Sequence, residues 1–313
     1  MTQRILERGQ IETLTSRSIP RVRLPDRTRV FADRAARLRT LAKGHALGGY
    51  LELMAALCDA QQRALVQHAP AQPDPDTIAR AREHAMPAVP ASGPRDAAWQ
   101  RVLHTLIADV TGSPGAPSQL VELASRIGTA SSDWLEAQAD AALGERSDLL
   151  DLAAAPFVMA ALQVHWIALS ANFAADDVTT LDAPGVCPLC GSLPVASIVH
   201  TAAPYQGYRY LHCALCATEW HRVRIHCTGC GAAGKDIGYH TLSRADASDG
   251  NAAVRAESCE QCRGYRKIVY REKDPGVEPL ADDLATLALD VLLGEHGYHR
   301  LSTNPLLWQR AGD

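Results

Sequence analysis

The chain has 313 residues, of which 47% are hydrophobic and 21% charged, and its formal net charge is -4 at pH 7. This composition excludes an intrinsically disordered chain, and the length allows two or three globular domains. The slightly acidic balance gives no overall reason to expect a nucleic-acid-binding protein, which usually carries a basic face.

The N-terminal segment is basic, because residues 1–43 hold eleven Arg or Lys and four Asp or Glu. Such an arm could meet an acidic partner or a membrane surface, but a solvated tail is the simpler interpretation. The first forty residues contain neither the apolar core of a secretory signal nor a twin-arginine pair. Together with cysteines that are clustered in pairs, this predicts a cytoplasmic protein in a reducing compartment.

Residues 1–178 are predicted to form an all-helical domain. Apolar side chains recur there at helical spacing, and β-branched runs are almost absent. Turns rich in Pro, Gly, Ser or Asp separate the helical stretches. We expect helices over residues 30–41, 51–65, 99–107, 118–127 and 132–143.

One further stretch, residues 152–175, contains no Asp, Glu, Lys or Arg and is long enough to cross a bilayer. It is rich in alanine, however, and Gln163, His165 and Asn172 would each need a polar partner in hydrocarbon. We therefore expect a buried helix at the centre of a bundle, and no stable membrane insertion.

Beyond residue 182 the helical periodicity ends, Val, Ile, Tyr and Thr become more frequent, and the cysteine pairs begin. Short strands are predicted at residues 195–200, 208–212, 220–225 and 265–270. A single helix is expected over residues 279–293, with Pro279 in its first turn. Asp282 and Asp283 would then lie near the positive end of the helix dipole, which is a simpler account of them than acid–base catalysis.

Eight of the nine cysteines form four Cys-x-x-Cys pairs, and this is the strongest signal in the chain. Two intervening residues let both sulfurs of a pair approach one ion from a single tight turn, and two such turns complete a tetrahedron. A glycine follows the first and third pairs, where it can adopt a positive φ as the chain leaves the turn. The predicted metal ligands are Cys187, Cys190, Cys213, Cys216, Cys227, Cys230, Cys259 and Cys262.

The four pairs can be divided into two sites in three ways. A CxxCG motif begins at residue 187 and again at residue 227, and each is followed by a CxxC that leads into an aromatic and basic strand. This duplication favours a sequential division, with the first two pairs in one four-cysteine site and the last two in the other. A cross-braced arrangement, first pair with third and second with fourth, is the alternative.

The spacing does not decide the metal, because tetrahedral sulfur ligation suits zinc and a single iron ion equally. Four protein ligands leave no open coordination position, so neither site is predicted to be a hydrolytic centre. Iron would make the sites redox-active, whereas zinc would make them structural.

Other interpretations of these motifs are weaker. A thioredoxin-like dithiol uses one CxxC, and four pairs argue against it. A nucleic-acid-binding zinc ribbon stays an alternative because of its basic strands, although residues 177–275 hold eleven basic and ten acidic side chains.

His212, His221 and His226 adjoin the cysteines and are expected to support them or to lie on the surface. Cys58 is expected to be a buried small hydrophobe. No catalytic constellation stands out, so no enzymatic activity is predicted.

The paired cysteines lie in stretches that read CPLCGSLPVAS, YRYLHCALCATEWHRVRIHCTGCG and RAESCEQCRGYRKIVYREKDPGVEPLADDLATLALD, and NPLL follows at residues 304–307. These stretches resemble the formate dehydrogenase accessory protein family of the FdhE type. The resemblance covers residues 184–307 closely, whereas the helical half is similar only in kind. It implies a cytoplasmic, non-catalytic assembly factor that acts on the catalytic subunit of respiratory formate dehydrogenase. It also implies rubredoxin-like modules that bind iron through the paired cysteines.

The predicted fold is multidomain α+β. An all-α helical domain covers residues 1–178, two tandem rubredoxin-like or zinc-ribbon β modules cover 179–226 and 227–277, and a C-terminal helix and tail over 278–313 pack on the modules. The predicted function is an accessory protein that binds the immature catalytic subunit of formate dehydrogenase and carries two metal ions, iron or zinc. Two alternatives stay open: an iron-based redox protein acting on the client's cofactor, and a zinc-ribbon protein that binds nucleic acid.

Overall fold

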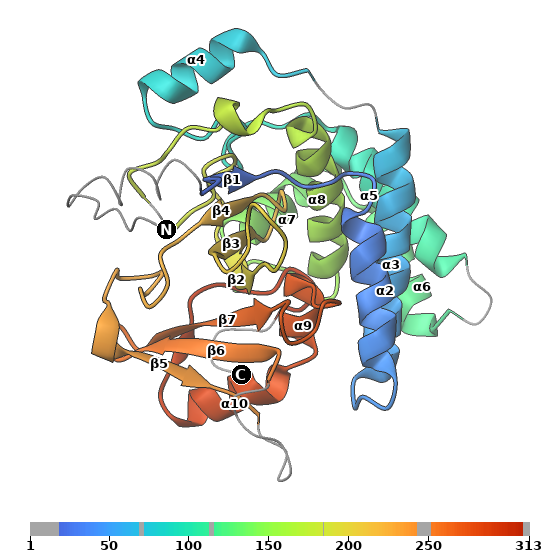
Figure 1. Cartoon of the computed structure of the whole chain (residues 1–313). Coiled ribbons are helices and arrows are strands. Elements are labelled where there is room, and N and C mark those ends of the chain that lie inside the picture. Colours follow the sequence, from blue (N-terminus) through green and yellow to red (C-terminus); the bar gives the residue numbers. More distant parts are fainter. Residues whose placement is uncertain (1–18, 69–71, 113–115, 184, 243–251, 309–313) are drawn as a thin grey trace, which may run out of the picture.

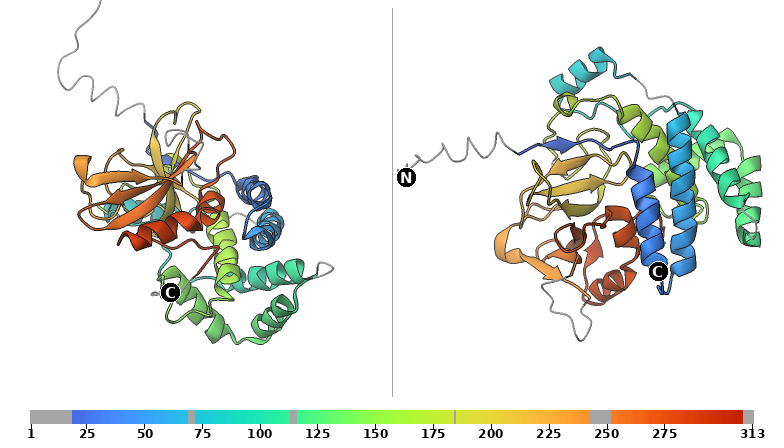
Figure 2. Two further views of the ribbon diagram at one scale, coloured as in Figure 1. Left: turned by 90° about the horizontal axis from the view of Figure 1, so that it is seen from below. Right: turned by 45° about the vertical axis from the view of Figure 1, so that its right-hand side comes forward.

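The computed structural model describes residues 19–68, 72–112, 116–183, 185–242 and 252–308. Its long helices α2 (Val30–Ala42), α3 (Gly48–Gln67) and α8 (Ala155–Ser170) lie on one side of the molecule and the strands on the other (Figure 1). The view from below shows further helices on the side of this group that faces away from the sheet (Figure 2, left). A helical region therefore flanks a sheet, as the sequence predicts for an α+β chain.

The other elements of the helical region agree with the predicted pattern. Asp74 caps α4, because its carboxylate accepts hydrogen bonds from the backbone N–H groups of Asp76 and Thr77. These elements are α4 (Pro75–Glu83), α5 (Ala98–Thr111), α6 (Ser118–Thr129), α7 (Ser132–Leu143) and the short 3-10 helix η1 (Ala175–Asp177). Each of the five helices expected from apolar spacing is confirmed.

Helix α8 lies at the centre of the helical region, where it packs against α3, α5 and α7. Nearly all of its residues are buried, which confirms the expected core helix. Its residue Gln163 has partners on both sides: Gln163 Nε2 donates to the carbonyl of Ala214 at 2.7 Å, and Gln61 Nε2 donates to Gln163 Oε1 at 3.0 Å. Over the residues described, no helix is both long and apolar enough to span a bilayer.

The strands of the described residues form one mixed sheet in the order β1-β4-β3-β2-β7-β6-β5, with β8 beside β7. They are β1 (Val22–Arg23), β2 (Pro194–Val199), β3 (Arg209–Cys213), β4 (Glu219–His221), β5 (Ile237–His240), β6 (Val254–Cys259), β7 (Gly264–Tyr270) and β8 (His299–Arg300). The 3-10 helix η2 (Gly234–Asp236) precedes β5.

The centre of this sheet joins the two cysteine-bearing halves. Strand β2 pairs with β7 in parallel, with Ser197 opposite Ile268, whereas β2, β3 and β4 pair with one another antiparallel, as do β5, β6 and β7. A parallel pair cannot be closed by a hairpin, so it links segments that are distant in sequence. The two predicted modules therefore share one sheet, which the cysteine spacing does not reveal.

One predicted strand is wrong in length. The strand expected over residues 220–225 is β4, which ends at His221. Its partner β3 begins at Arg209, whose carbonyl accepts from the backbone N–H of Arg222 at 3.0 Å. Beyond this point β3 offers no further backbone partner, so the β pattern of the side chains is not enough to extend the strand.

The single C-terminal helix expected over residues 279–293 is also wrong, because it is broken into α9 (Pro279–Leu284) and α10 (Leu287–Glu295). The buried ammonium of Lys267 accounts for the break. It donates to the carbonyls of Asp283 and Thr286 at 2.7 and 3.1 Å, where an unbroken helix would use them for its own hydrogen bonds.

Asp282 lies in the first turn of α9, as expected, and its Oδ2 accepts a hydrogen bond from the backbone N–H of Glu278, but the helix dipole is not the whole account of Asp282 and Asp283. Both carboxylates are buried and ion-paired: Asp282 with Arg37 of α2 at 2.6 Å, and Asp283 with Arg300 at 2.9 Å. They connect α9 to the helical region on one side and to β8 on the other. Their neighbours in space come from chain segments that no local pattern could identify.

The main apolar core extends from the helices into the first cysteine-bearing module. Leu189, Leu211 and Leu215 of that module are fully buried in the same cluster as Leu103 and Leu162 of the helices. The second module instead has small clusters of its own, such as the one formed by Ala256, Tyr265, Leu289 and Leu293.

Candidate metal centres

The first four predicted ligands meet beside strands β2 and β3. Cys187 and Cys190 lie in the turn before β2, Cys213 ends β3, and Cys216 lies in the turn between β3 and β4. The four Sγ atoms lie within 4.8 Å of one another. Cys187 Sγ is 3.6 Å from Cys216 Sγ, and Cys190 Sγ is 3.5 Å from Cys213 Sγ.

The last four ligands repeat this arrangement beside β6 and β7. Their Sγ atoms again lie within 4.8 Å of one another. Cys227 Sγ is 3.6 Å from Cys262 Sγ, and Cys230 Sγ is 3.6 Å from Cys259 Sγ. The structure thus groups the pairs sequentially and not in the cross-braced arrangement.

The turn that holds each first pair has the same backbone in both modules. The N–H of Cys187 donates to the carbonyl of Ser192 and the N–H of Gly191 to that of Cys187, at 2.9 and 2.8 Å. Cys227 donates to Ala232, and Gly231 donates to Cys227, at 2.7 and 3.1 Å. Both glycines adopt the positive φ that the sequence analysis expected, +80° and +81°.

The second pair of each site leaves its turn in the same way without a glycine. Ala217 follows Cys216 with φ 56°, and Arg263 follows Cys262 with φ 58°. A left-handed conformation costs a non-glycine residue of the order of 1–2 kcal/mol, so the surrounding structure must hold both turns in place. Four similar turns therefore present eight sulfurs in two equivalent sets.

The geometry fits a tetrahedrally coordinated ion. Metal–sulfur bonds of about 2.3 Å correspond to sulfur–sulfur separations of about 3.8 Å, close to the distances above. Backbone donors also face the sulfurs: the N–H groups of Leu215 and Cys216 lie 3.4 Å from Cys213 Sγ, and that of Gly229 lies 3.3 Å from Cys227 Sγ. Such donors stabilise a thiolate, which is the form that binds a metal.

The thiols of the first site do not share one protonation behaviour. Burial raises the pKa of Cys187 and of Cys213 well above its usual value. Burial also acts on Cys190, but hydrogen bonds from Cys187 and Cys213 outweigh it and hold the Cys190 pKa well below its usual value. Four thiolates this close together repel one another, and a divalent cation at their centre would offset that repulsion.

Family models cover nearly all of the described chain. The model described as "FdhE, N-terminal" matches residues 19–182, "FdhE, central domain" matches residues 186–224, and "FdhE, C-terminal domain" matches residues 225–307. The chain belongs to the FdhE family.

Relatives and a solved structure agree with this membership. Protein FdhE of Escherichia coli K12 is 38% identical over 98% of this chain and 97% of its own length. A protein FdhE homolog of Cronobacter sakazakii is 37% identical over the full length of both chains. The crystal structure of the FdhE protein from Pseudomonas aeruginosa is similar with a TM-score of 0.80 and 39% identity, over 92% of this chain and 98% of that one. The FdhE-type resemblance of the cysteine motifs therefore extends to the helical half.

The two sites of this FdhE family member differ in their exposure. All four cysteines of the first site are buried, and none is more than 1% exposed. In the second site Cys227 and Cys259 are buried, Cys262 is partly exposed and Cys230 is exposed. The ligand sets are alike, but only the second can be reached from solvent.

A buried acid that the sequence analysis missed supports the first site. Glu219 Oε2 lies 2.6 Å from His200 Nε2, and Glu219 Oε1 lies 3.2 Å from His212 Nδ1, next to the ligand Cys213. Burial opposes the charge of Glu219, but its hydrogen bonds with the two histidines hold its pKa well below the usual value. The carboxylate thereby braces β3 against β4. In the sequence, the one signal that could have indicated this role of Glu219 is the presence of an acidic residue within a strand.

The other residues named in the sequence analysis, His221, His226 and Cys58, belong to neither cysteine set. His221 is partly buried between Tyr208 and Tyr210, with ring centroids 5.7 Å apart in both cases. His226 is partly buried and joins Ala233 through a backbone bridge. Cys58 is fully buried in the helical core, as expected, and burial raises its pKa to about 12.

Proposed function

We propose that this protein is a cytoplasmic accessory factor for respiratory formate dehydrogenase, that it binds the immature catalytic subunit, and that its two four-cysteine sets hold iron or zinc. One observation supports this above the others: two closed sulfur sets occur in a chain that matches the FdhE family along its whole described length. A bound ion would supply a rigid link between the two turns of each set and, if it is iron, a one-electron redox change.

The residues around the two cysteine sets would keep the surface that binds the client in a fixed shape. Four protein ligands leave a metal ion no position for a substrate, so binding and positioning are the simplest tasks for these sites. The paired turns, their N–H···S contacts and the Glu219 brace would keep the modules in one shape. A rigid surface binds with little loss of conformational entropy, which suits a protein that must recognise an immature partner.

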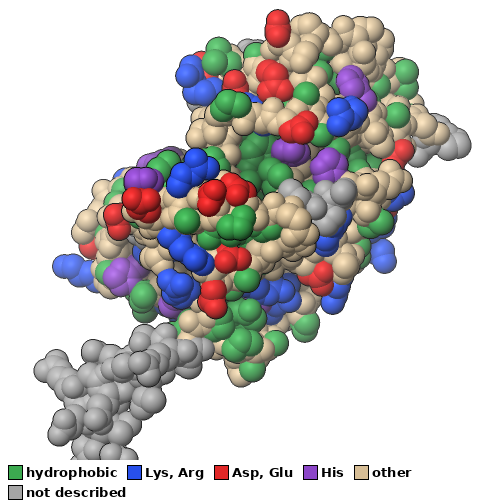
Figure 3. All heavy atoms as spheres, turned by 90° about the horizontal axis from the view of Figure 1, so that it is seen from above, with side chains coloured by type: hydrophobic (Ala, Val, Ile, Leu, Met, Phe, Trp, Pro, Cys, Tyr) green, Lys and Arg blue, Asp and Glu red, His purple; other side chains and the backbone are tan. Residues whose placement is uncertain are grey.

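The surface charge gives less support to nucleic acid as the partner. On the described part of the face in Figure 3, Lys and Arg are interspersed with Asp and Glu, and they form no continuous basic patch. Nucleic-acid binding relies on such a patch to replace the counterions of the phosphates.

A redox role is a second candidate, and the exposed Cys230 supports it. An iron ion at the second site would lie near the surface, where a client cofactor could approach it. Reversible bleaching of visible absorption by dithionite in the anaerobically purified protein would support this role. Colourless, zinc-loaded protein that still binds the client would exclude it.

The proposed function is tested by mixing the purified full-length chain with the purified catalytic subunit of formate dehydrogenase, before and after cofactor insertion. We expect a complex on size-exclusion chromatography with the cofactor-free subunit, and weaker binding to the mature one. Absence of a complex with both forms would overturn the proposal. Equal binding of an unrelated molybdenum enzyme subunit would overturn the assignment of the client.

A further inference from the structure

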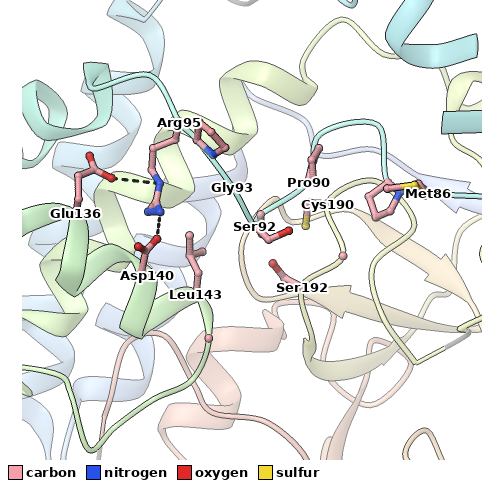
Figure 4. A pocket seen from close by; sticks show the side chains of 15 residues that line it. Met86, Pro90, Ser92, Gly93, Arg95, Glu136, Asp140, Leu143, Cys190 and Ser192 are labelled. Carbon is pink, nitrogen blue, oxygen red and sulfur yellow. Dashed lines mark hydrogen bonds and ion pairs between the residues drawn. The ribbon is translucent and has the colours of Figure 1, made fainter. Parts of the chain in front are cut away.

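A cavity of about 720 Å³ lies where the helical region meets the first metal centre. Its lining comes from three segments: the loop of residues 86–95, residues 136–144 of α7 and its C-terminal end, and the turn of residues 190–192. Figure 4 shows Arg95, Asp140 and Leu143 on one side of this space, and Ser92, Ser192 and Cys190 on the other. We refer to it as the turn cleft.

One wall of the turn cleft is held rigidly against the metal centre. The N–H of Val89 donates to the carbonyl of Leu189 at 2.9 Å, and that of Ala91 donates to the carbonyl of Cys190 at 2.8 Å. Pro90 lies between them and has no N–H, and Met86 is 55% exposed at the rim. The wall is thus fixed to the cysteine turn, partly apolar and accessible.

Two buried polar groups of the turn cleft have atoms without a hydrogen-bond partner within the described chain: the Arg95 guanidinium, at Nε and Nη1, and the Ser192 hydroxyl, at Oγ. The Arg95 side chain is only 5% exposed, its Nε lies 3.4 Å from Glu136 Oε2, and its Nη2 contacts Asp140. A buried donor left unpaired costs about 1–3 kcal/mol. Both groups line the cleft, so an occupant with carbonyl oxygens would satisfy them.

The charge of the turn cleft is negative. Two carboxylates, Glu136 and Asp140, face a single arginine, and the Asp140 side chain is 70% exposed. Four thiolates around a divalent ion would add a net charge of about -2 behind Cys190. A cationic occupant is therefore favoured over an anionic one.

We propose that the turn cleft binds an extended, basic segment of the client, and this rests on the proposed function. Backbone carbonyls of the segment accept hydrogen bonds from Arg95 Nη1 and Ser192 Oγ. A basic side chain pairs with the exposed carboxylate of Asp140, and apolar side chains rest on Met86 and Leu143. The client thereby contacts the first metal centre through the turn that carries Cys190.

The first test uses a fluorescein-labelled peptide of alternating arginine and alanine, with a glutamate–alanine peptide for comparison, and measures anisotropy with the full-length protein. Asp140→Lys should weaken binding of the arginine peptide by about tenfold or more, and Met86→Lys by about threefold. Matched controls lie outside the cleft: Asp109→Lys, on an exposed ion pair with Arg63, and Val121→Lys, on exposed α6. Both should change affinity by less than about twofold.

Metal content and the melting curve of each variant show whether it is folded, and Met86→Lys disturbs no ion pair. The proposal is overturned if wild-type protein binds the two peptides equally, or if the controls weaken binding as much as the cleft variants. It is also overturned if the arginine peptide binds only after removal of residues 1–18, because the occupant is then this N-terminal stretch of the chain itself.

The second test uses the purified catalytic subunit, with a photo-cross-linking amino acid at position 86 or, as control, at position 121. Cross-linking from position 86 alone, to a basic stretch of the subunit, is the expected result. If the subunit binds wild type, Asp140→Lys and Met86→Lys equally, the cleft proposal fails and the proposed function stands. If the subunit does not bind wild-type protein while the arginine peptide does, the proposed function fails and the cleft keeps its basic ligand.

Discussion

The two four-cysteine sets share their turns and their sulfur–sulfur distances but not their surroundings. The first lies beneath the helical region, and its turns carry Leu189 and Leu215 into the main apolar core. The second lies at the edge of the molecule and exposes Cys230. Two metal centres with the same ligand geometry can therefore contribute differently to stability. The packing around each centre determines how much of the fold depends on its ion.

Besides the pairing of β2 with β7, a buried ionic network holds the second module to the C-terminal helices and β8. The Lys267 ammonium is fully buried, lies 2.6 Å from Asp290 and 3.5 Å from Asp283, and Arg300 contacts both carboxylates. Tyr265 donates to Asp290 at 2.7 Å. The first module depends on burial in the main apolar core, whereas the second combines small apolar clusters of its own with a buried ionic network.

The largest expected difference comes from removing one ligand at each site. Cys190→Ser should abolish the main cooperative melting transition, because structural metal sites contribute about 10–16 kcal/mol in small modules and this one is part of the core. Cys230→Ser should release the second ion but leave the helical region folded. Circular dichroism melting and limited proteolysis with mass spectrometry compare them. Identical melting curves for the two variants would contradict the distinction.

The ionic network gives the next effect. Lys267→Met should destabilise the chain by about 3–5 kcal/mol, because it leaves the buried Asp283 and the partly buried Asp290 without their central cation. The control is Arg63→Ala, which breaks an exposed pair with Asp109 and should cost less than about 1 kcal/mol. Urea unfolding measures both, and a loss of under about 1 kcal/mol in Lys267→Met would show that the network does not anchor the module.

The sequence predicts the two cysteine sets but not the different surroundings of each set. Four CxxC pairs and two following glycines are local signals, so the clustering of the eight cysteines and their sequential division could be inferred. The helices with clear apolar spacing could be inferred for the same reason. The parallel pairing of β2 with β7, the Lys267 network and the cleft at Arg95 join residues that are far apart in the chain. A periodic pattern in the sequence does not indicate such long-range contacts. The unequal exposure of Cys190 and Cys230 follows from these contacts.

Acid should weaken the helical core before it affects the sites' ligands. Burial and the neighbouring His68 lower the pKa of His165, at the centre of α8, to about 4. The unfolded chain protonates this histidine near pH 6.5, so stability is full above that pH, falls as pH decreases and levels off below about pH 4. As the pH falls, the free energy of unfolding of His165→Phe should therefore decrease by about 1–3 kcal/mol less than that of wild type. Unfolding followed at pH 7, 6 and 5 tests this, and an equal slope in the variant would contradict it.

A smaller effect concerns the rate of metal loss. With zinc in both sites, an excess of a chromogenic chelator should remove one ion at least about tenfold faster than the other, a difference of about 1.4 kcal/mol in barrier. The fast phase should be absent in Cys230→Ser, because the exposed site supplies it. A single phase that releases both ions would show that burial does not protect the first site.

The metal-to-protein ratio of anaerobically purified full-length protein tests the two-centre account most directly. Elemental analysis should find two ions per chain in wild type, two in Cys58→Ser and one in Cys230→Ser, with all cysteines reduced. A ratio that is the same in all three proteins, or sulfurs recovered as disulfides in the protein that binds its client, would contradict the account.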